Sequence, residues 1–341
     1  MKNILHIAAL TLALTANSVL AQEVRTGLSD LKISDARRDR PLEGFIWYPT
    51  KETARLKAHQ SNGVWQGIQA IEDAEPLTGK RPFVVLSHGM YGNARNQNWL
   101  ADALVQHGFV VAAIHHPGTS SWMRDPDQAR QMWDRPGDIS RVIDHVLTDP
   151  TISTHIDPER IYMAGHSLGG MTAVALAGGR FDAPKMDAFC AARPREMVCG
   201  LLDLWKIAKT PEDAKAMQAD LSDPRIKGFA MFDLGATQTF STASLNAIAR
   251  PLLVIGAPKG ESDVNLDVES RALRAAVPAE FVTYMEPENL SHFDFLGVCK
   301  PGGLAILQAE EPEDAFICAD GVEERMADQA IVIEAVLAAF Q

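Results

Sequence analysis

Positive charge is in short supply in this sequence. Lys and Arg together number 32 against 44 Asp and Glu, so the 341 residues carry a formal net charge of −12 at pH 7. A surface of this sign repels phosphate backbones and anionic lipid headgroups. Nucleic acid and anionic membranes are therefore excluded as favoured partners. The hydrophobic share of 46% is ordinary for a globular protein.

Long hydrophobic runs are also missing, except at the start of the chain. Residues 4–14 are almost wholly apolar and follow the positive Lys2, and Ala21 before Gln22 suits signal peptidase. This apolar stretch is short for a bilayer and gives way to polar residues. We therefore predict a secretory signal peptide over residues 1–21, cleavage near Ala21, no membrane span in the mature protein, and a secreted or periplasmic location.

Cysteine is scarce, with four in the whole chain: Cys190, Cys199, Cys299 and Cys318. Neither close pair has the C-x-x-C form and no histidines cluster beside them, which argues against a metal site. In an oxidising compartment an even number of cysteines favours disulfides. We predict that Cys190 pairs with Cys199 and Cys299 with Cys318, because each bridge then closes a short local loop.

What the chain does contain is an alternation of apolar runs and helical patterns. Residues 81–89 form a continuous apolar run bounded by proline and glycine, typical of a strand buried on both faces of a parallel sheet. Repeated strand–helix–strand units predict an α/β fold. We expect strands at 44–49, 81–89, 109–114, 160–164, 226–232, 251–255 and 281–285, and helices at 99–107, 136–147, 171–177, 244–249, 269–276 and 325–340.

Two segments depart from this alternation. Residues 51–80 are polar, contain glycine and show no firm period, so we expect a loop. Residues 180–225 hold four prolines, one cysteine pair and a helical patch at 201–208. This segment is predicted to be an insertion, which either caps the functional site or is a surface excursion. We find no internal repeat, and residues 22–341 are expected to form a single domain.

The segment that carries chemistry is Gly165-His166-Ser167-Leu168-Gly169. A G-x-S-x-G sequence between a predicted strand and a predicted helix is typical of a nucleophile elbow, a sharp turn that lifts the serine hydroxyl into a cleft. Glycine suits both flanking positions because strand and helix crowd the turn. The free N–H groups at the start of the helix favour an anionic intermediate. Ser167 is therefore the candidate nucleophile.

A serine hydroxyl needs a base within hydrogen-bond reach and an acid to orient that base. Elbow enzymes of this type place their residues in the order Ser, Asp or Glu, His. His292 is the only histidine downstream of Ser167, so we assign it as the base. For the acid we prefer Asp263, on the loop after the 251–255 strand. Asp233, which follows the preceding strand, stays open as the alternative.

Two backbone N–H groups are expected to form the oxyanion hole. One belongs to Leu168, the residue after the nucleophile. The other is assigned to Met90, in the loop after the 81–89 strand. His88, in the same loop, lies upstream of the nucleophile and is expected to brace the loop rather than to accept the proton.

These features together resemble the α/β-hydrolase superfamily, in particular secreted bacterial proteins similar to dienelactone hydrolase and to platelet-activating-factor acetylhydrolase. Cutinases and other polyester hydrolases share part of the pattern. The resemblance covers residues 81–300 in ordered blocks, namely Leu86-Ser87-His88-Gly89-Met90, His107-Gly108-Phe109-Val110-Val111-Ala112-Ala113, Arg135-Pro136-Gly137-Asp138-Ile139, Ile156-Asp157-Pro158-Glu159-Arg160-Ile161, Gly165-His166-Ser167-Leu168-Gly169-Gly170 and Ser291-His292-Phe293.

The resemblance implies an α/β-hydrolase fold, with a mostly parallel twisted central sheet, helices on both faces and an inserted cap-like segment. It also implies hydrolysis of carboxylic esters through an acyl-enzyme, with Ser167 and His292 in the family roles. The acetylhydrolases resemble this chain in having an aspartate at the position of Asp233. Dienelactone hydrolase itself uses a cysteine nucleophile, so its lactone specificity does not carry over.

We therefore predict a serine ester hydrolase that needs no metal and no organic cofactor. Its partner is expected to be a small-molecule, lipid or polyester-fragment ester. Two alternatives stay open: an amidase or peptidase with the same three residues, and a non-catalytic binding protein on the same fold.

Overall fold

The scaffold is a ten-stranded sheet with the strand order β10-β9-β8-β7-β5-β6-β2-β1-β4-β3. The structure is a computed structural model that describes residues 24–34, 40–260 and 264–341. The predicted signal peptide at 1–21 lies outside these residues. The strands are β1 (Arg25–Ile33), β2 (Leu42–Thr50), β3 (Lys57–His59), β4 (Ile68–Glu72), β5 (Arg81–Ser87), β6 (Val110–His115), β7 (Ile156–His166), β8 (Ile226–Phe232), β9 (Leu252–Ile255) and β10 (Val282–Met285).

Strands β5 to β10 form one parallel block, because β5 pairs parallel with β6 and β7, and the sheet continues parallel through β8, β9 and β10. β2 joins this block antiparallel to β6, and β1 pairs antiparallel with β2. In a parallel block all carboxyl ends reach the same edge, where ligands bind in open α/β sheets. The loops that carry the predicted site residues all begin at this edge.

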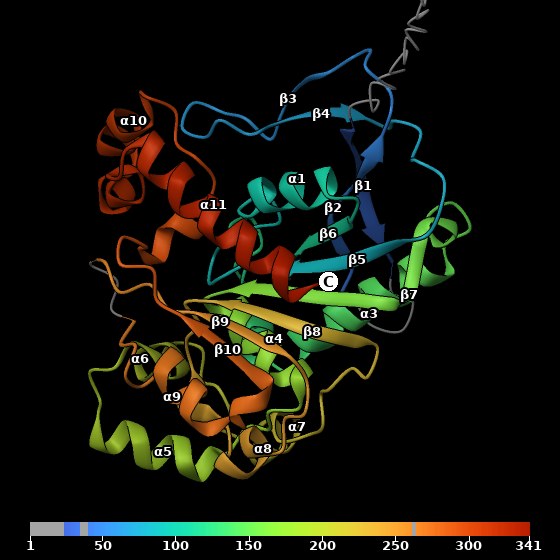
Figure 1. Ribbon diagram of the computed structural model, residues 1–341. Coiled ribbons are helices and arrows are strands. Elements are labelled where there is room, and N and C mark those ends of the chain that lie inside the picture. Colours follow the sequence, from blue (N-terminus) through green and yellow to red (C-terminus); the bar gives the residue numbers. More distant parts are fainter. Residues whose placement is uncertain (1–23, 35–39, 261–263) are drawn as a thin grey trace, which may run out of the picture.

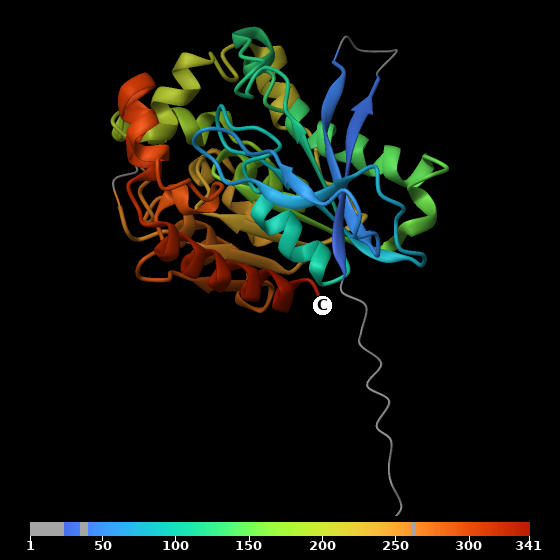
Figure 2. The ribbon, with the colours of Figure 1, turned by 90° about the horizontal axis from the view of Figure 1, so that it is seen from above.

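Helices cover both faces of the sheet. α1 (Asn98–Gln106) and α11 (Val322–Ala339) pack on one face (Figures 1 and 2), and α3 (Asp134–Thr148) and α4 (Leu168–Ala177) pack on the other. The remaining helices are α2 (Pro126–Arg130), α5 (Ala183–Ala192), α6 (Met197–Leu204), α7 (Pro211–Met217), α8 (Thr242–Asn246), α9 (Ser270–Ala276) and α10 (Gly303–Glu310).

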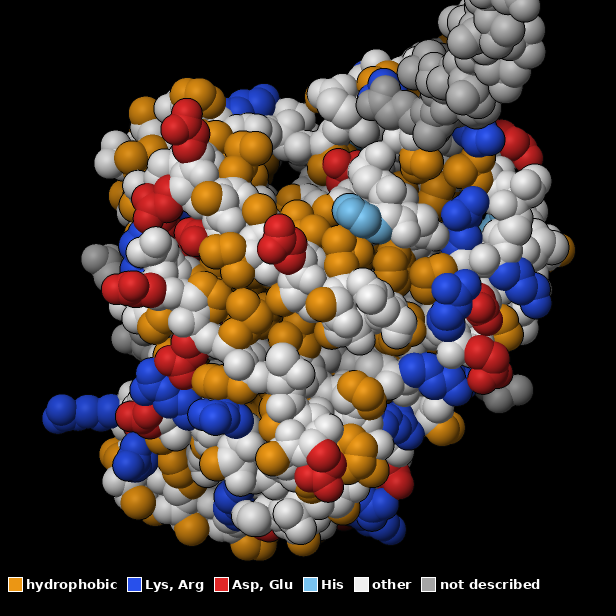
Figure 3. Space-filling view, viewed as in Figure 1, with side chains coloured by type: hydrophobic (Ala, Val, Ile, Leu, Met, Phe, Trp, Pro, Cys, Tyr) orange, Lys and Arg blue, Asp and Glu red, His pale blue; other side chains and the backbone are white. Residues whose placement is uncertain are grey.

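The side chains of β5 show why the sheet needs helices on both faces. Phe83 and Val85 point into the core under α3 and α4, whereas Val84 and Leu86 point into the core under α1 and α11. A strand that is apolar at every position must be buried on both sides. On the α11 face hydrophobic side chains gather at the surface in Figure 3, and Met326 and Ile331 of α11 are among those exposed.

The expected elements from residue 81 onward are present, but one expectation was wrong and some elements were not predicted. The 51–80 segment is not only loop, because β3 and β4 form there and β4 adds to β1 in parallel. β1 itself was not predicted, nor was α10. β3, β4 and α10 are short, so their apolar pattern spans too few residues to stand out, whereas β1 is longer but mixes polar and apolar side chains.

The 180–225 insertion contains three helices, α5, α6 and α7, instead of one helical patch at 201–208. Two prolines that looked like helix breakers lie in the first turns of α5 and α7, where a missing N–H costs nothing. Asp182 and Thr210 cap these helices with their side-chain oxygens.

Both predicted disulfides are confirmed. Cys190 of α5 is bonded to Cys199 of α6, with Cα atoms 5.5 Å apart, and Cys299 is bonded to Cys318, with Cα atoms 5.8 Å apart. The first bridge holds α5 and α6 of the insertion together. Within the described part of the chain, no helix is both long enough and apolar enough to cross a membrane.

Candidate active site

Ser167 lies at a strained turn between β7 and α4. Its backbone has φ 53° and ψ −116°, a conformation that a residue with a side chain rarely adopts. The turn is tight enough to require glycine on both sides. A Cβ on Gly165 would lie 2.1 Å from the carbonyl oxygen of Gly169, and a Cβ on Gly169 would lie 2.0 Å from that of Ser87. The Ser167 side chain is half-buried.

His292 begins a short 3₁₀ helix, η4 (His292–Phe295), on the loop after β10. Its Nδ1 lies 2.6 Å from Oδ2 of Asp233, and both side chains are buried. The Asp233 carboxylate accepts that hydrogen bond, so Nδ1 carries the proton and Nε2 keeps a free lone pair. This tautomer is the one that a general base requires.

Asp233 is fixed from several directions. It directly follows β8 with φ 40°, and its backbone N–H donates to the carbonyl oxygen of Ile255 over 2.7 Å. Its Oδ1 accepts from the backbone N–H of Ala257 over 3.1 Å. Asp263, the acid preferred from the sequence, lies outside the described residues. The carboxylate that contacts His292 is the one that sequence reasoning kept as the alternative.

His166 links the elbow directly to the loop of the base. Its Nε2 lies 2.8 Å from the carbonyl oxygen of His292, and the two imidazole rings are 4.6 Å apart between centroids. Burial lowers the pKa of His166 well below its ordinary value, so the neutral ring donates this hydrogen bond through Nε2–H. The residue next to Ser167 thereby holds His292 in place. Sequence reasoning missed this role, since position 166 carries no distinct signal in a G-x-S-x-G motif.

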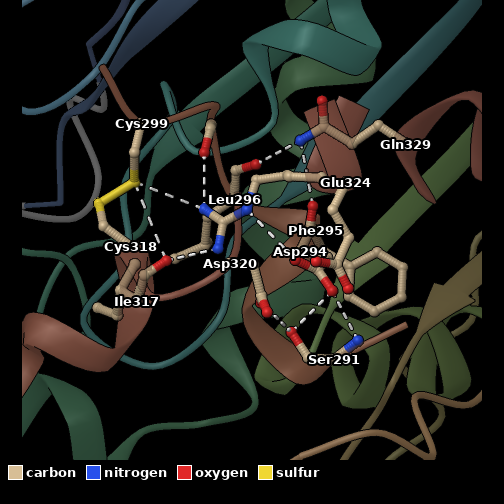
Figure 4. Close-up of polar contacts among 12 residues, drawn as sticks. Ser291, Asp294, Phe295, Leu296, Cys299, Ile317, Cys318, Asp320, Glu324 and Gln329 are labelled. Carbon is tan, nitrogen blue, oxygen red and sulfur yellow. Dashed lines mark hydrogen bonds and ion pairs between the residues drawn. A yellow bond between two sulfur atoms is a disulfide. The ribbon is translucent and has the colours of Figure 1, made fainter. Parts of the chain in front are cut away.

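A buried polar cluster supports the His292 loop from behind (Figure 4). Asp294 accepts from the backbone N–H of Ser291 over 2.7 Å, and Arg325 of α11 donates from Nε to Asp294 Oδ1 over 3.2 Å. Gln329, one turn further along α11, donates to the carbonyl oxygens of Asp294 and Leu296.

Arg325 also connects this loop to the second disulfide. Its guanidinium donates to the carbonyl oxygens of Gly297 and Ile317, and Nη1 lies 3.7 Å from Cys299 Sγ. Ile317 directly precedes Cys318, so the bridge to Cys299 keeps this carbonyl in place. The α11 helix and the disulfide therefore position the turn that carries His292.

The predicted oxyanion segments both reach Ser167. A Cβ on Gly89 would lie 3.1 Å from Cβ of Ser167, so the chain before Met90 passes close beside the nucleophile. Leu168 begins α4, where a backbone N–H has no partner within the helix. Met90 exposes 41% of its surface, so its side chain is not what holds the loop.

His88 holds the Met90 loop in shape, which confirms its expected bracing role. Its Nδ1 lies 2.7 Å from the carbonyl oxygen of Gly89, and its Nε2 accepts from the backbone N–H of His116 over 3.0 Å. Both ring nitrogens are thus occupied. Burial and the nearby Arg135 charge lower the pKa of His88 well below its ordinary value, so the ring is neutral.

Aromatic side chains flank the site on two sides. From the insertion, Trp205 donates from Nε1 to the Tyr91 hydroxyl over 3.1 Å, and the two rings meet edge to face. On the other side, Phe293 meets His292 edge to face and also contacts Phe316, which is 43% exposed. The insertion therefore contacts the residue that follows Met90. Among the described residues, no group of three His, Cys, Asp or Glu is placed to hold a metal ion.

This chain is similar in sequence or in structure to several known proteins. The family model described as "Serine aminopeptidase, S33" matches residues 78–194. The chain is 34% identical to cutinase est1 of Thermobifida alba over 102 residues, which is 29% of this chain and 31% of the cutinase. It is 34% identical to lipase 1 of Moraxella sp. (strain TA144) over 153 residues, which is 45% of this chain and 43% of the lipase.

The chain thus spans about a third of the length of the cutinase it matches. A similarity over nearly the whole chain comes from a solved structure, the ferulic acid esterase from Streptomyces cinnamoneus. The two share a TM-score of 0.59 and 19% sequence identity over 94% of this chain and 90% of that one. This likeness and the sheet topology confirm the fold class expected from the sequence. The dienelactone-hydrolase and acetylhydrolase subtypes stay predictions.

Proposed function

We propose that this α/β-hydrolase cleaves carboxylic esters, with Ser167 as nucleophile, His292 as general base and Asp233 as the acid that orients it. The observation that carries the proposal is the contact between His292 and Asp233, because it leaves the Nε2 lone pair of a buried imidazole free to accept a proton. The hydrogen bond from His166 to the His292 carbonyl keeps this base beside the elbow. The similarity to proteins named as a cutinase, a lipase and a ferulic acid esterase supports the proposal.

The proposed reaction has two halves. Ser167 Oγ attacks the ester carbonyl while its proton moves to Nε2 of His292, and the carbonyl π electrons move onto oxygen. The tetrahedral intermediate collapses when His292 protonates the departing alkoxide, which leaves an acyl-enzyme and an alcohol. Water then loses a proton to His292 and attacks the acyl carbon, and the acid leaves as Ser167 regains its proton. Asp233 stabilises the imidazolium in both halves.

The negative charge on the intermediate needs two aligned donors. We assign these to the backbone N–H groups of Met90 and Leu168, which approach Ser167 from β5 and α4. Such donors are worth about 10²- to 10³-fold in kcat when they are fixed before the reaction begins. No metal or organic cofactor takes part in this scheme.

The substrate class is proposed from the walls of the site. Tyr91 on one side and Phe293 and Phe316 on the other offer apolar and aromatic surface, and the buried Trp205 packs against Tyr91 from behind. Such walls suit small aromatic or acyl esters, lipid esters or polyester fragments. The contact between Trp205 and Tyr91 supports a cap role for the 180–225 insertion, within a single domain of residues 22–341.

The cellular location is part of the same proposal. Two disulfides require an oxidising compartment for their formation. Together with the predicted signal peptide at 1–21 and cleavage near Ala21, they support a secreted or periplasmic enzyme. Mass spectrometry of the mature N-terminus tests the cleavage site.

The experiment that tests the activity compares the wild type with Ser167→Ala on short-chain p-nitrophenyl esters and on matched anilides. We expect turnover of the esters, little turnover of the anilides, and a loss of several orders of magnitude in kcat for the variant. A fluorophosphonate probe should label the wild type and not the variant. Near-normal turnover by Ser167→Ala would overturn the nucleophile assignment, and preferred anilide cleavage would instead indicate an amidase.

A further inference from the structure

We propose that Arg135 is a positioning residue that holds both backbone arms of the oxyanion hole. The inference rests on the proposed function, since it takes Met90 and Leu168 as the two donors. Arg135 lies in the first turn of α3 and is only 1% exposed. It touches none of the three proposed triad residues, and no part of the mechanism above uses it.

The first arm is the segment that ends at Met90. Nη2 of Arg135 donates to the carbonyl oxygen of His88 over 2.6 Å and to Ser87 Oγ over 3.2 Å. The His88 carbonyl belongs to the peptide group just before Gly89, so this bond fixes the chain two residues ahead of the Met90 N–H.

The same arm is held on its far side. Nη1 of Arg135 donates to Thr119 Oγ1 over 2.6 Å, and the carbonyl oxygen of Thr119 accepts from the Tyr91 backbone N–H over 2.8 Å. Tyr91 directly follows Met90 and has φ 52°, a strained conformation that needs outside support. Arg135 therefore constrains the chain on both sides of the Met90 donor.

The second arm is the start of α4. Nε of Arg135 donates to Thr172 Oγ1 over 3.1 Å, and the Thr172 hydroxyl donates in turn to the carbonyl oxygen of Leu168 over 3.1 Å. The two arms also pack tightly on each other, since a Cβ on Gly169 would clash with the Ser87 carbonyl oxygen. One guanidinium thus sets the spacing of two segments that are about 80 residues apart in the chain.

The charge of Arg135 adds to its geometric role. Burial lowers the pKa of Arg135 to about 9, so the side chain is still protonated at neutral pH. Its four hydrogen-bond acceptors are hydroxyl or carbonyl oxygens and carry no charge. Asp138, one turn along α3, is bound to Arg40 at 2.7 and 2.9 Å and acts on Arg135 through its charge without a hydrogen bond. A positive charge in this dry setting favours a negative intermediate nearby.

The test compares Arg135→Met and Thr172→Val with Thr172→Ser and the wild type. Arg135→Met removes the hydrogen bonds to both arms. Thr172→Val removes only the hydroxyl that links Arg135 to the Leu168 carbonyl, and Thr172→Ser keeps that hydroxyl. Arg225→Gln serves as the control, because Arg225 also bonds α3, through Asp144 and the Ser140 carbonyl, but does so away from the site.

The readouts are kcat and KM on a p-nitrophenyl ester, and the inhibition constant of an alkyl boronic acid, which becomes a tetrahedral anion on the serine. We expect Arg135→Met to lower kcat about 10²-fold, to leave KM within about twofold and to weaken boronate inhibition in proportion to kcat. Thr172→Val should lower kcat about 10-fold, and Thr172→Ser and Arg225→Gln should match the wild type. The acid limb of the pH–kcat profile should not move, because His292 is untouched.

Circular dichroism identifies variants that fail to fold. If Arg135→Met fails to fold, the kcat and the boronate affinity of Thr172→Val decide whether the inference holds. A folded Arg135→Met or Thr172→Val enzyme with wild-type kcat and boronate affinity overturns the inference while leaving the proposed function intact. A wild type that the fluorophosphonate probe does not label at Ser167 overturns both. A parallel shift of the pH profile would show that Arg135 acts on the base, which also contradicts the inference.

Discussion

Nε2 of His166 donates a hydrogen bond to the carbonyl oxygen of His292 over 2.8 Å. The residue that precedes the proposed nucleophile thus holds the backbone of the proposed base, 126 positions further along the chain. Nucleophile and base are positioned by one short contact between the end of β7 and the loop after β10.

This contact predicts a loss of activity when the His166 donor is removed. We expect His166→Ala to lower kcat about 10- to 10²-fold on a p-nitrophenyl ester with little change in KM, because a displacement of the base of about 1 Å costs that much. His166→Gln, which offers an amide N–H, should restore part of the loss. His107→Gln, at the exposed C-cap of α1, is the matched control. Equal activity in His166→Ala and His107→Gln would contradict the prediction.

The identity of the acid is tested by two asparagine variants. We expect Asp233→Asn to lower kcat about 10³- to 10⁴-fold, because the amide no longer fixes the His292 tautomer. Asp263→Asn should keep kcat within about twofold of the wild type. Steady-state kinetics at neutral pH measure both. The reverse pattern would assign the acid to Asp263.

The buried Arg325–Asp294 pair is expected to matter for both stability and activity. Arg325→Met leaves the Asp294 carboxylate without its charged partner, and breaking a buried pair costs about 3–5 kcal/mol of unfolding free energy. Urea unfolding measures this loss. Arg271→Gln, which removes a half-exposed arginine bound to Glu286, should cost less than about 1 kcal/mol.

The same variant tests whether the cluster positions His292. At urea concentrations below its unfolding midpoint, where the variant is still folded, Arg325→Met should show a reduced kcat. Arg271→Gln should keep the kcat of the wild type. A folded Arg325→Met enzyme with full kcat would restrict this cluster to a stabilising role.

The buried carboxyl group of Glu269 is expected to make the unfolding free energy of the protein depend on pH. Its Oε2 accepts from the backbone N–H of Thr237 over 2.7 Å, and Thr237 lies four residues after Asp233. Burial raises the pKa of Glu269 from 4.5 to about 7. Because the folded pKa lies above the unfolded one, folding favours the protonated carboxyl. The contribution of this group is therefore largest below pH 4.5 and falls as the pH rises to about 7, by up to about 3 kcal/mol.

The matching variant is Glu269→Gln, which keeps an oxygen acceptor and cannot ionise. Between pH 5 and pH 8 the wild type should lose up to about 3 kcal/mol more unfolding free energy than this variant. Urea titrations at the two pH values measure the difference, and Glu280→Gln at an exposed site serves as control. Parallel pH dependences in all three proteins would show that Glu269 does not titrate as proposed.

Local sequence patterns were enough to predict the central strands, the turn at Ser167, the base and the disulfides. Continuous apolar runs indicated the central parallel strands, and the glycines around Ser167 indicated a tight strand-to-helix turn. Elimination pointed to His292, since it is the only histidine after the candidate serine. The disulfide pairing followed from loop length. In each case the signal lies within a few residues or in a simple count, so no knowledge of the packing is needed.

Tertiary structure decided which distant groups meet. Asp233 and Asp263 follow neighbouring parallel strands, β8 and β9, so their order in the chain could not show which carboxylate contacts His292. The same reason hid the roles of His166, Arg135 and Arg325, whose partners lie far along the chain or on another element. Parallel strands bring all their carboxyl ends to one edge, and only the packing of the loops at that edge selects the contacts.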